Sequence, residues 1–152
     1  MVDPDLAIRT AYYNAITGNI PIGNDSPEYT VPFYVQVPSD TTYPYIYNSD
    51  FTKTRNRTKD CFGWDVTVTL VIVSFFQGNS GGQATNDKIA TQVEELIVGP
   101  NPANQNLLNF GTQFYCVSSD LITSTTMPPQ DVEDGTVFYR ILKFKHLTFQ
   151  QV

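Results

Sequence analysis

The sequence has little charge, two cysteines and a single histidine. Charged residues make up 16% of the 152 residues, and Cys61 and Cys116 are too few for a disulfide framework or a zinc site. No serine or cysteine motif accompanies His146, which is therefore interpreted as an ordinary surface or sheet histidine. These absences predict reduced cysteines that serve packing, no cofactor or metal, and a protein that is not an enzyme.

The chain also lacks a basic excess and a long apolar run. A net charge of −6 argues against a sequence-specific nucleic-acid binder, whose binding face would be basic. The longest apolar run, Leu70 to Phe76, is too short to cross a bilayer, and no basic region followed by an apolar run marks a signal peptide. We expect a soluble protein, made in a cytoplasm, with no membrane partner.

Two segments resemble known ligand sites but depart from their patterns. The glycine-rich segment Gln77 to Gln83 lies where a phosphate loop would lie, but it lacks the G-K-[ST] ending. Asp131, Glu133 and Asp134 lack the spacing of a calcium loop. We interpret the first segment as a flexible connection and the second as a solvated acidic loop.

Aromatic residues are abundant, with ten Phe and nine Tyr among the 152 residues. A chain of this length fits one domain, residues 1–152, that buries enough surface to fold without disulfides. Much aromatic surface with little charge to keep copies apart favours assembly.

One stretch, Gly63 to Phe76, is predicted to be the central strand. Apolar and polar residues alternate in its first half, so one face there is expected to be wet. Its second half is apolar on both parities, which indicates cover on both faces. The run is about twice the usual strand length, so we expect a bend or a bulge along it.

The remaining patterns predict an α+β fold. A helix begins at Asp3-Pro4-Asp5 and ends at Gly18, and a second amphipathic helix spans Ala84 to Val98. Other strands are expected over Thr30 to Val37, Tyr43 to Tyr47, Thr112 to Ile122 and Thr136 to Gln150, and loops over 19–28, 101–109 and 127–135. The fold is expected to be a mostly antiparallel, twisted sheet of four to five strands, with both helices packed on one side.

A basic connection is expected at the tip of a long hairpin whose return arm is the central strand. Lys53, Arg55, Arg57 and Lys59 alternate with polar residues, so in an extended chain all four project from one face. A solvated loop is one interpretation. The other is that this tip contacts an acidic surface on a neighbouring copy or a partner, or the phosphates of DNA.

A tyrosine-rich segment precedes this connection. Tyr34, Tyr43, Tyr45 and Tyr47 lie on predicted strands and can form an aromatic platform. Tyr45 and Tyr47 are candidate interface residues, together with Lys53, Arg55, Arg57 and Lys59. A small binding module that holds a peptide or a glycan on this surface is the alternative function.

The same region carries a resemblance to a known family. The run F-Y-V-Q-V-P-S-D-T-T-Y-P-Y-I-Y, from Phe33 to Tyr47, resembles the Val-Pro, spacer, Pro-Tyr-Ile/Val segment of the tail terminator (tail completion, minor tail protein U-like) proteins of tailed bacteriophages. The order of a first helix, this segment, a long strand, a helix and a closing strand is similar over nearly the whole chain.

The resemblance implies a structural protein of the virion neck, assembled in the host cytoplasm. Tail terminators form hexameric rings on the last layer of the tail tube, stop its polymerisation and join it to the head connector or stopper proteins, while DNA passes through the lumen. The resemblance carries no catalytic residue to this chain. The loops at 19–28, 101–109 and 127–135 depart from the family pattern, which leaves open another neck, connector or baseplate subunit.

Overall fold

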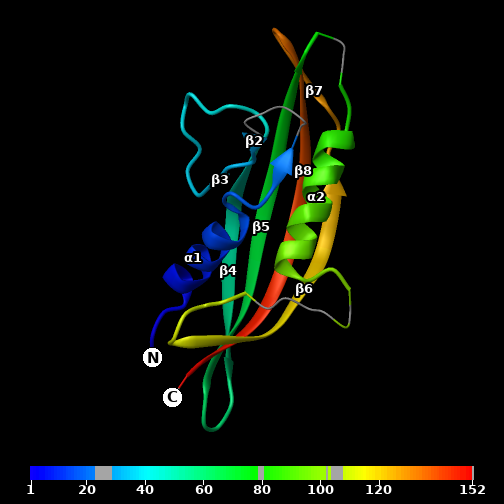
Figure 1. Ribbon diagram of the computed structural model, residues 1–152. Coiled ribbons are helices and arrows are strands. Elements are labelled where there is room, and N and C mark those ends of the chain that lie inside the picture. Colours follow the sequence, from blue (N-terminus) through cyan, green and yellow to red (C-terminus); the bar gives the residue numbers. More distant parts are fainter. Residues whose placement is uncertain (23–28, 79–80, 102, 104–107, 152) are drawn as a thin grey trace.

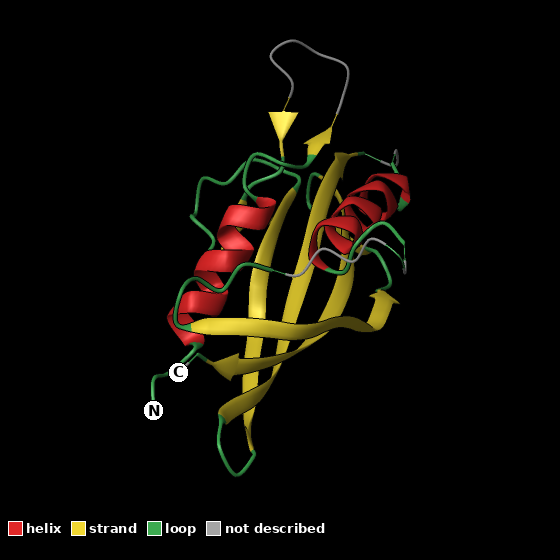
Figure 2. Cartoon of the chain, turned by 60° about the horizontal axis from the view of Figure 1, so that its bottom comes forward, coloured by secondary structure: helices red, strands yellow, loops and turns green. Residues whose placement is uncertain are grey.

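The protein has an α+β fold, as the sequence predicts, with both helices against one face of a curved sheet (Figures 1 and 2). The computed structural model describes residues 1–22, 29–78, 81–101, 103 and 108–151. The elements in chain order are α1 (Asp5–Ile16), β1 (Pro21–Ile22), β2 (Tyr29–Thr30), β3 (Phe33–Tyr34), β4 (Tyr45–Arg57), β5 (Phe62–Gln77), α2 (Ala84–Ile97), β6 (Phe114–Thr126), β7 (Gln130–Val132) and β8 (Gly135–Gln150).

The main sheet has the strand order β3-β4-β5-β8-β6, and β7 pairs with the start of β8. Every pairing is antiparallel except that of β3 with β4. β5, β6 and β8 are the long strands that the sequence predicts, whereas β4 is longer than expected, because it continues from the predicted Tyr43 to Tyr47 strand through Arg57. The single strand predicted over Thr30 to Val37 is wrong, because only the two-residue strands β2 and β3 form there. The prediction of a plain loop over residues 127–135 is wrong, because after Pro128-Pro129 the chain returns beside β8 and forms β7.

The central strand β5 is confirmed, and of the bend or bulge expected along it, its pairing with β8 shows no bulge. Its pairing with β8 runs without a register shift from Gly63 opposite Phe149 to Gln77 opposite Gly135. The irregularities lie in the two outer long strands, once in β4 against β5 and twice in β6 against β8. An extra residue bends the strand that carries it and increases its local twist, so these bulges act on β4 and β6.

The main core lies between the helices and the sheet. The apolar parity of β5, including Val66, Leu70 and Ile72, is fully buried there. The helices add their own buried stripes, Ile8, Ala11, Tyr12 and Ile16 from α1 and Ile89, Ala90, Val93 and Ile97 from α2. Asp3 Oδ1 accepts the Asp5 backbone N–H at 2.9 Å, so Asp3 satisfies one of the free amides at the start of α1, as predicted.

A second, smaller apolar cluster lies on the sheet face away from the helices, which we call the open face. Val71, Val73 and Val137 are 6%, 2% and 7% exposed there. They are covered by larger side chains of the same face: Tyr45, Tyr47, Phe75, Tyr139 and Ile141. The second half of β5 is therefore buried on both faces, as expected, but aromatic side chains provide the outer cover.

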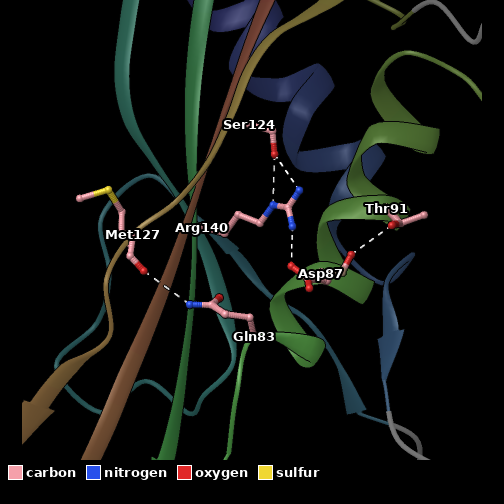
Figure 3. A network of polar contacts seen from close by, with 6 residues as sticks. All are labelled: Gln83, Asp87, Thr91, Ser124, Met127 and Arg140. Atoms are coloured by element: carbon pink, nitrogen blue, oxygen red, sulfur yellow. Dashed lines mark hydrogen bonds and ion pairs between the residues drawn. The ribbon is translucent and has the colours of Figure 1, made fainter.

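A network of polar contacts holds α2 against strands β6 and β8 (Figure 3). Arg140 on β8 donates to Asp87 of α2, and its Nε and Nη2 donate to Ser124 Oγ on β6 at 3.1 and 2.8 Å. Gln83, just before α2, donates to the Met127 carbonyl at 3.5 Å. These contacts link one helix to two strands, so α2 is held by more than its apolar stripe.

Candidate interaction surfaces

The predicted basic hairpin is present and forms one end of the molecule (Figure 1). Lys53, Arg55 and Arg57 lie on β4 and pair in turn with Val66, Trp64 and Phe62 of β5. Since they are spaced two residues apart in a regular strand, all three project from the helix side of the sheet. Lys59 lies in the exposed turn beyond the end of β4.

Lys53 differs from Arg55, Arg57 and Lys59, because it already forms ion pairs within the described chain. Its Nζ lies 2.6 Å from Asp3 and 2.8 Å from Asp5, the two carboxylates at the start of α1. The hydrogen bond from Lys53 lowers the pKa of Asp3 to about 2. Lys53 therefore ties the first turn of α1 to β4. The sequence shows no local signal for this pair, which joins residues far apart in the chain.

Arg55 and Arg57 are exposed and stack on one ring. Their guanidinium carbons lie 5.4 and 6.0 Å from the centre of Phe62, across the hairpin. Within the described part of the chain, neither makes an ion pair with a carboxylate. Stacking contributes about 0.5–1 kcal/mol at exposed sites and restricts the guanidinium groups, while their N–H donors stay available for a partner. We call Arg55, Arg57 and Lys59 the basic tip.

The tyrosines singled out from the sequence come together at the edge of the open face. Tyr45 lies at the centre, with ring centroids 6.2 Å from Tyr34, 5.4 Å from Tyr43 and 6.2 Å from Tyr47. Tyr43 also contacts Phe75, at 5.5 Å, and is 41% exposed. Burial, with the neighbouring tyrosines, raises the pKa of Tyr45 above its usual value. This tyrosine cluster offers apolar rings with neutral hydroxyl groups as a contact surface.

His146 belongs to a buried polar network that the sequence analysis missed. It is 0% exposed, on the helix side of β8. One ring nitrogen, Nε2, forms a hydrogen bond with the Tyr12 hydroxyl of α1, and Nδ1 forms one with Ser119 Oγ of β6 at 2.7 Å. Cys116 Sγ lies 3.3 Å from Ser119 Oγ. In a strand, His146 lies on the same face as Leu142 and Phe144. This alternation was the sequence signal from which its burial could have been predicted.

The network contains residue types that are common in catalytic sites, but solvent and substrate have no access to it. Tyr12 and Ser119 are 1% and 2% exposed, so a substrate cannot reach His146 in this conformation. Burial lowers the pKa of His146 to about 4, and burial raises the pKa of Tyr12 well above its usual value. Both groups are therefore neutral at physiological pH, and the network links α1, β6 and β8 as a structural contact.

The weaker candidates gain no support as ligand sites. Asp131, Glu133 and Asp134 are exposed, and no group of three or more His, Cys, Asp or Glu in the described ranges could hold a metal ion. The segment Gln77 to Gln83 lies partly outside the described residues. Cys61 and Cys116 are free, as predicted. Neither α1 nor α2, the helices found where the chain is described, has the length and apolar character to cross a membrane.

Comparison with known proteins finds a similar fold in a solved structure. No family model and no curated protein matches the chain. Among solved structures, the chain is similar to one from the "Virion of native gene transfer agent (GTA) particle", with a TM-score of 0.57 and 12% sequence identity. The likeness covers 97% of this chain and 92% of that chain. Nearly the whole α+β fold described above is thus shared with a chain from a gene transfer agent virion.

Proposed function

We propose that this protein is a structural component of a phage-like virion at the head–tail junction. The observation that carries the proposal is the likeness, over nearly the full length of both chains, to a chain from a gene transfer agent virion. The Val37-Pro38 and Pro44-Tyr45-Ile46 signature adds the narrower assignment, a tail terminator. In this role the chain forms a hexameric ring that caps the tail tube and joins it to the head connector or stopper.

The exposed surfaces of the chain suit a protein that works by assembly. The basic tip, the tyrosine cluster and the open face all lie outside the main core and are accessible to partners. The His146 network, the cluster with catalytic residue types in the described part of the chain, is sealed from solvent. A net charge of −6 also fits a ring with an acidic lumen, which would repel phosphate and let DNA pass without sequence-specific binding.

Electron microscopy tests this function directly. Purified protein mixed with tail tubes is expected to form rings and to cap tube ends, and tubes assembled in its presence are expected to stop at a defined length. Antibody or gold labelling of particles is expected at the neck. A protein that ignores tubes and connectors would contradict the proposal, and label at the opposite end of the tail would favour a baseplate subunit instead.

A second candidate function rests on the tyrosine cluster. Tyr34 of β3 joins Tyr43, Tyr45 and Tyr47, just before and at the start of β4, on one surface, which is the arrangement of an aromatic platform for a peptide or a glycan. If the protein is such a module, it is expected to bind components of a glycan array, and Tyr45→Ala is expected to abolish that binding. Absence of any binding by the unmodified protein would remove this candidate.

A further inference from the structure

The two ends of the molecule carry opposite charges. The basic tip lies at the start of β5, where Arg57 pairs with Phe62, its first residue, and the turn between β7 and β8 lies at its last residue, since Gln77 pairs with Gly135. β5 has 16 residues, so the two ends are about 50 Å apart at roughly 3.3 Å per residue. Figure 1 shows the hairpin and the β7–β8 turn at opposite ends of the elongated sheet.

The turn at the far end is acidic and exposed. Asp131, Glu133 and Asp134 carry its charge, and all three side chains face solvent. Asp131 accepts a hydrogen bond from Thr136 at 3.0 Å, whereas Glu133 and Asp134 make no ion pair with any described residue. We call these three residues the acidic turn.

The basic tip is the matching half. Arg55 and Arg57 are held on the ring of Phe62 with no carboxylate partner in the described chain. Arginine held in this way presents a planar set of donors that matches carboxylates. Asp60 lies beside Lys59 in the turn and offsets one charge, so the tip keeps a net positive charge.

We infer that the basic tip of one copy docks on the acidic turn of the next copy of this chain. The inference deepens the proposed function, on which it rests, by naming a contact between subunits. The contact is heterologous, because two different surfaces meet, and such a contact builds a ring when its rotation closes and an open filament when it does not.

A second copy fits the basic tip better than DNA does. The tip has three cations next to an aspartate, on a chain whose net charge is −6, whereas binding of nucleic acid relies on a broad basic face. A carboxylate partner needs only a few well-placed donors, and the same chain supplies it at its other end. Opposite charges at the two ends also disfavour the head-to-head and tail-to-tail arrangements of two copies.

A charge exchange tests the contact. R55E/R57E and E133K/D134K are each expected to weaken self-association about tenfold or more, measured by sedimentation at low ionic strength, where exposed charges are least screened. The protein carrying all four changes is expected to regain the association of the unmodified protein, because the signs are exchanged and the pairing is kept. K88E reverses an exposed cation on α2, outside the basic tip, and serves as the control for charge reversal itself; it is expected to leave association unchanged.

Each outcome decides the inference. Weakening by both pairs without recovery in the combined variant overturns it, as does association unchanged by either pair, or an unmodified protein that stays monomeric. Loss of binding to a labelled DNA duplex in R55E/R57E, with E133K/D134K unaffected, assigns the tip to phosphate and also overturns it. The location of the protein in particles is read separately by electron microscopy, so failure of this contact leaves the proposed function to its own test.

Discussion

Lowering the pH from 7 to 4 is expected to remove about 3 kcal/mol of the free energy of unfolding through His146 alone. Burial lowers its pKa from 6.5 to about 4, and one unit of pKa corresponds to about 1.4 kcal/mol. Between these values the unfolded chain binds a proton that the folded chain does not bind. Stability is therefore fully present above pH 6.5 and falls as the pH falls towards 4.

The hydrogen-bond partners of His146 do not remove this cost. Tyr12 and Ser119 both present hydroxyl oxygens that can accept from a protonated ring, so the hydrogen bonds survive protonation. The ring also packs against the rings of Phe110 and Tyr12, and Cys116 Sγ contacts Ser119, the partner of Nδ1. Since none of these groups is anionic at low pH, the charge stays buried without a counter-ion, and this makes protonation costly.

Denaturant unfolding between pH 4 and 8, followed by the fluorescence of Trp64, measures the effect. His146→Gln keeps a hydrogen-bonding side chain but cannot titrate, so its stability is expected to lose most of the slope between pH 6.5 and 4. Tyr12→Phe keeps the imidazole and is expected to retain the slope. The pKa of the Asp3 carboxyl falls from its ordinary value of 3.8 to about 2 in the folded chain, so its effect on stability lies below the range from pH 4 to 8. Equal slopes for the unmodified protein and His146→Gln would contradict the assignment.

Leu142→Ala is expected to lower the free energy of unfolding by about 2–5 kcal/mol, because it empties a fully buried site. Leu142 is 0% exposed and pairs with Leu70 at the centre of the helix-facing core. A loss of this size is a large part of the 5–15 kcal/mol that is usual for a domain. The transition is measured by thermal or denaturant unfolding at neutral pH.

Leu147→Ala is the matched control for this change. It makes the same substitution on the same strand, but Leu147 lies on the open face opposite Asp65 and is only half-buried. We expect a loss of about 1 kcal/mol or less, in proportion to the smaller apolar area removed from contact. Equal losses at the two positions would mean that the two faces of the sheet contribute equally, contrary to the structure.

The sequence predicted the elements whose side-chain period is clear. β5 was found from its alternation and from the change to apolar residues on both parities, and α2 from its stripe of Ile89, Val93 and Ile97. The hairpin followed from a polar, basic connection between two strands. These features depend on neighbours in the chain, which a sequence displays directly.

Features that depend on distant partners could not be predicted in the same way. Lys53 pairs with Asp3 and Asp5 only because α1 packs beside β4. His146 meets Tyr12 and Ser119 only once three elements have assembled. The bulges in β4 and β6 are defined only by the register in which each strand pairs with its neighbour. The sequence identified the candidate interface residues, but only the fold shows which of them are already paired within the chain and which are exposed to a partner.

The position of β8 bears on how the chain reaches its native state. β6 precedes β8 in the chain but has no hydrogen-bonded neighbour other than β8 in the described sheet, and β8 lies between β5 and β6. Early in folding, β4 and β5 can join as a local hairpin, while β6 must wait for a strand that follows it. Pairing of β8 with β5 therefore joins the two parts of the sheet, and because these segments are far apart in the chain, we expect it to be slower than formation of the β4–β5 hairpin.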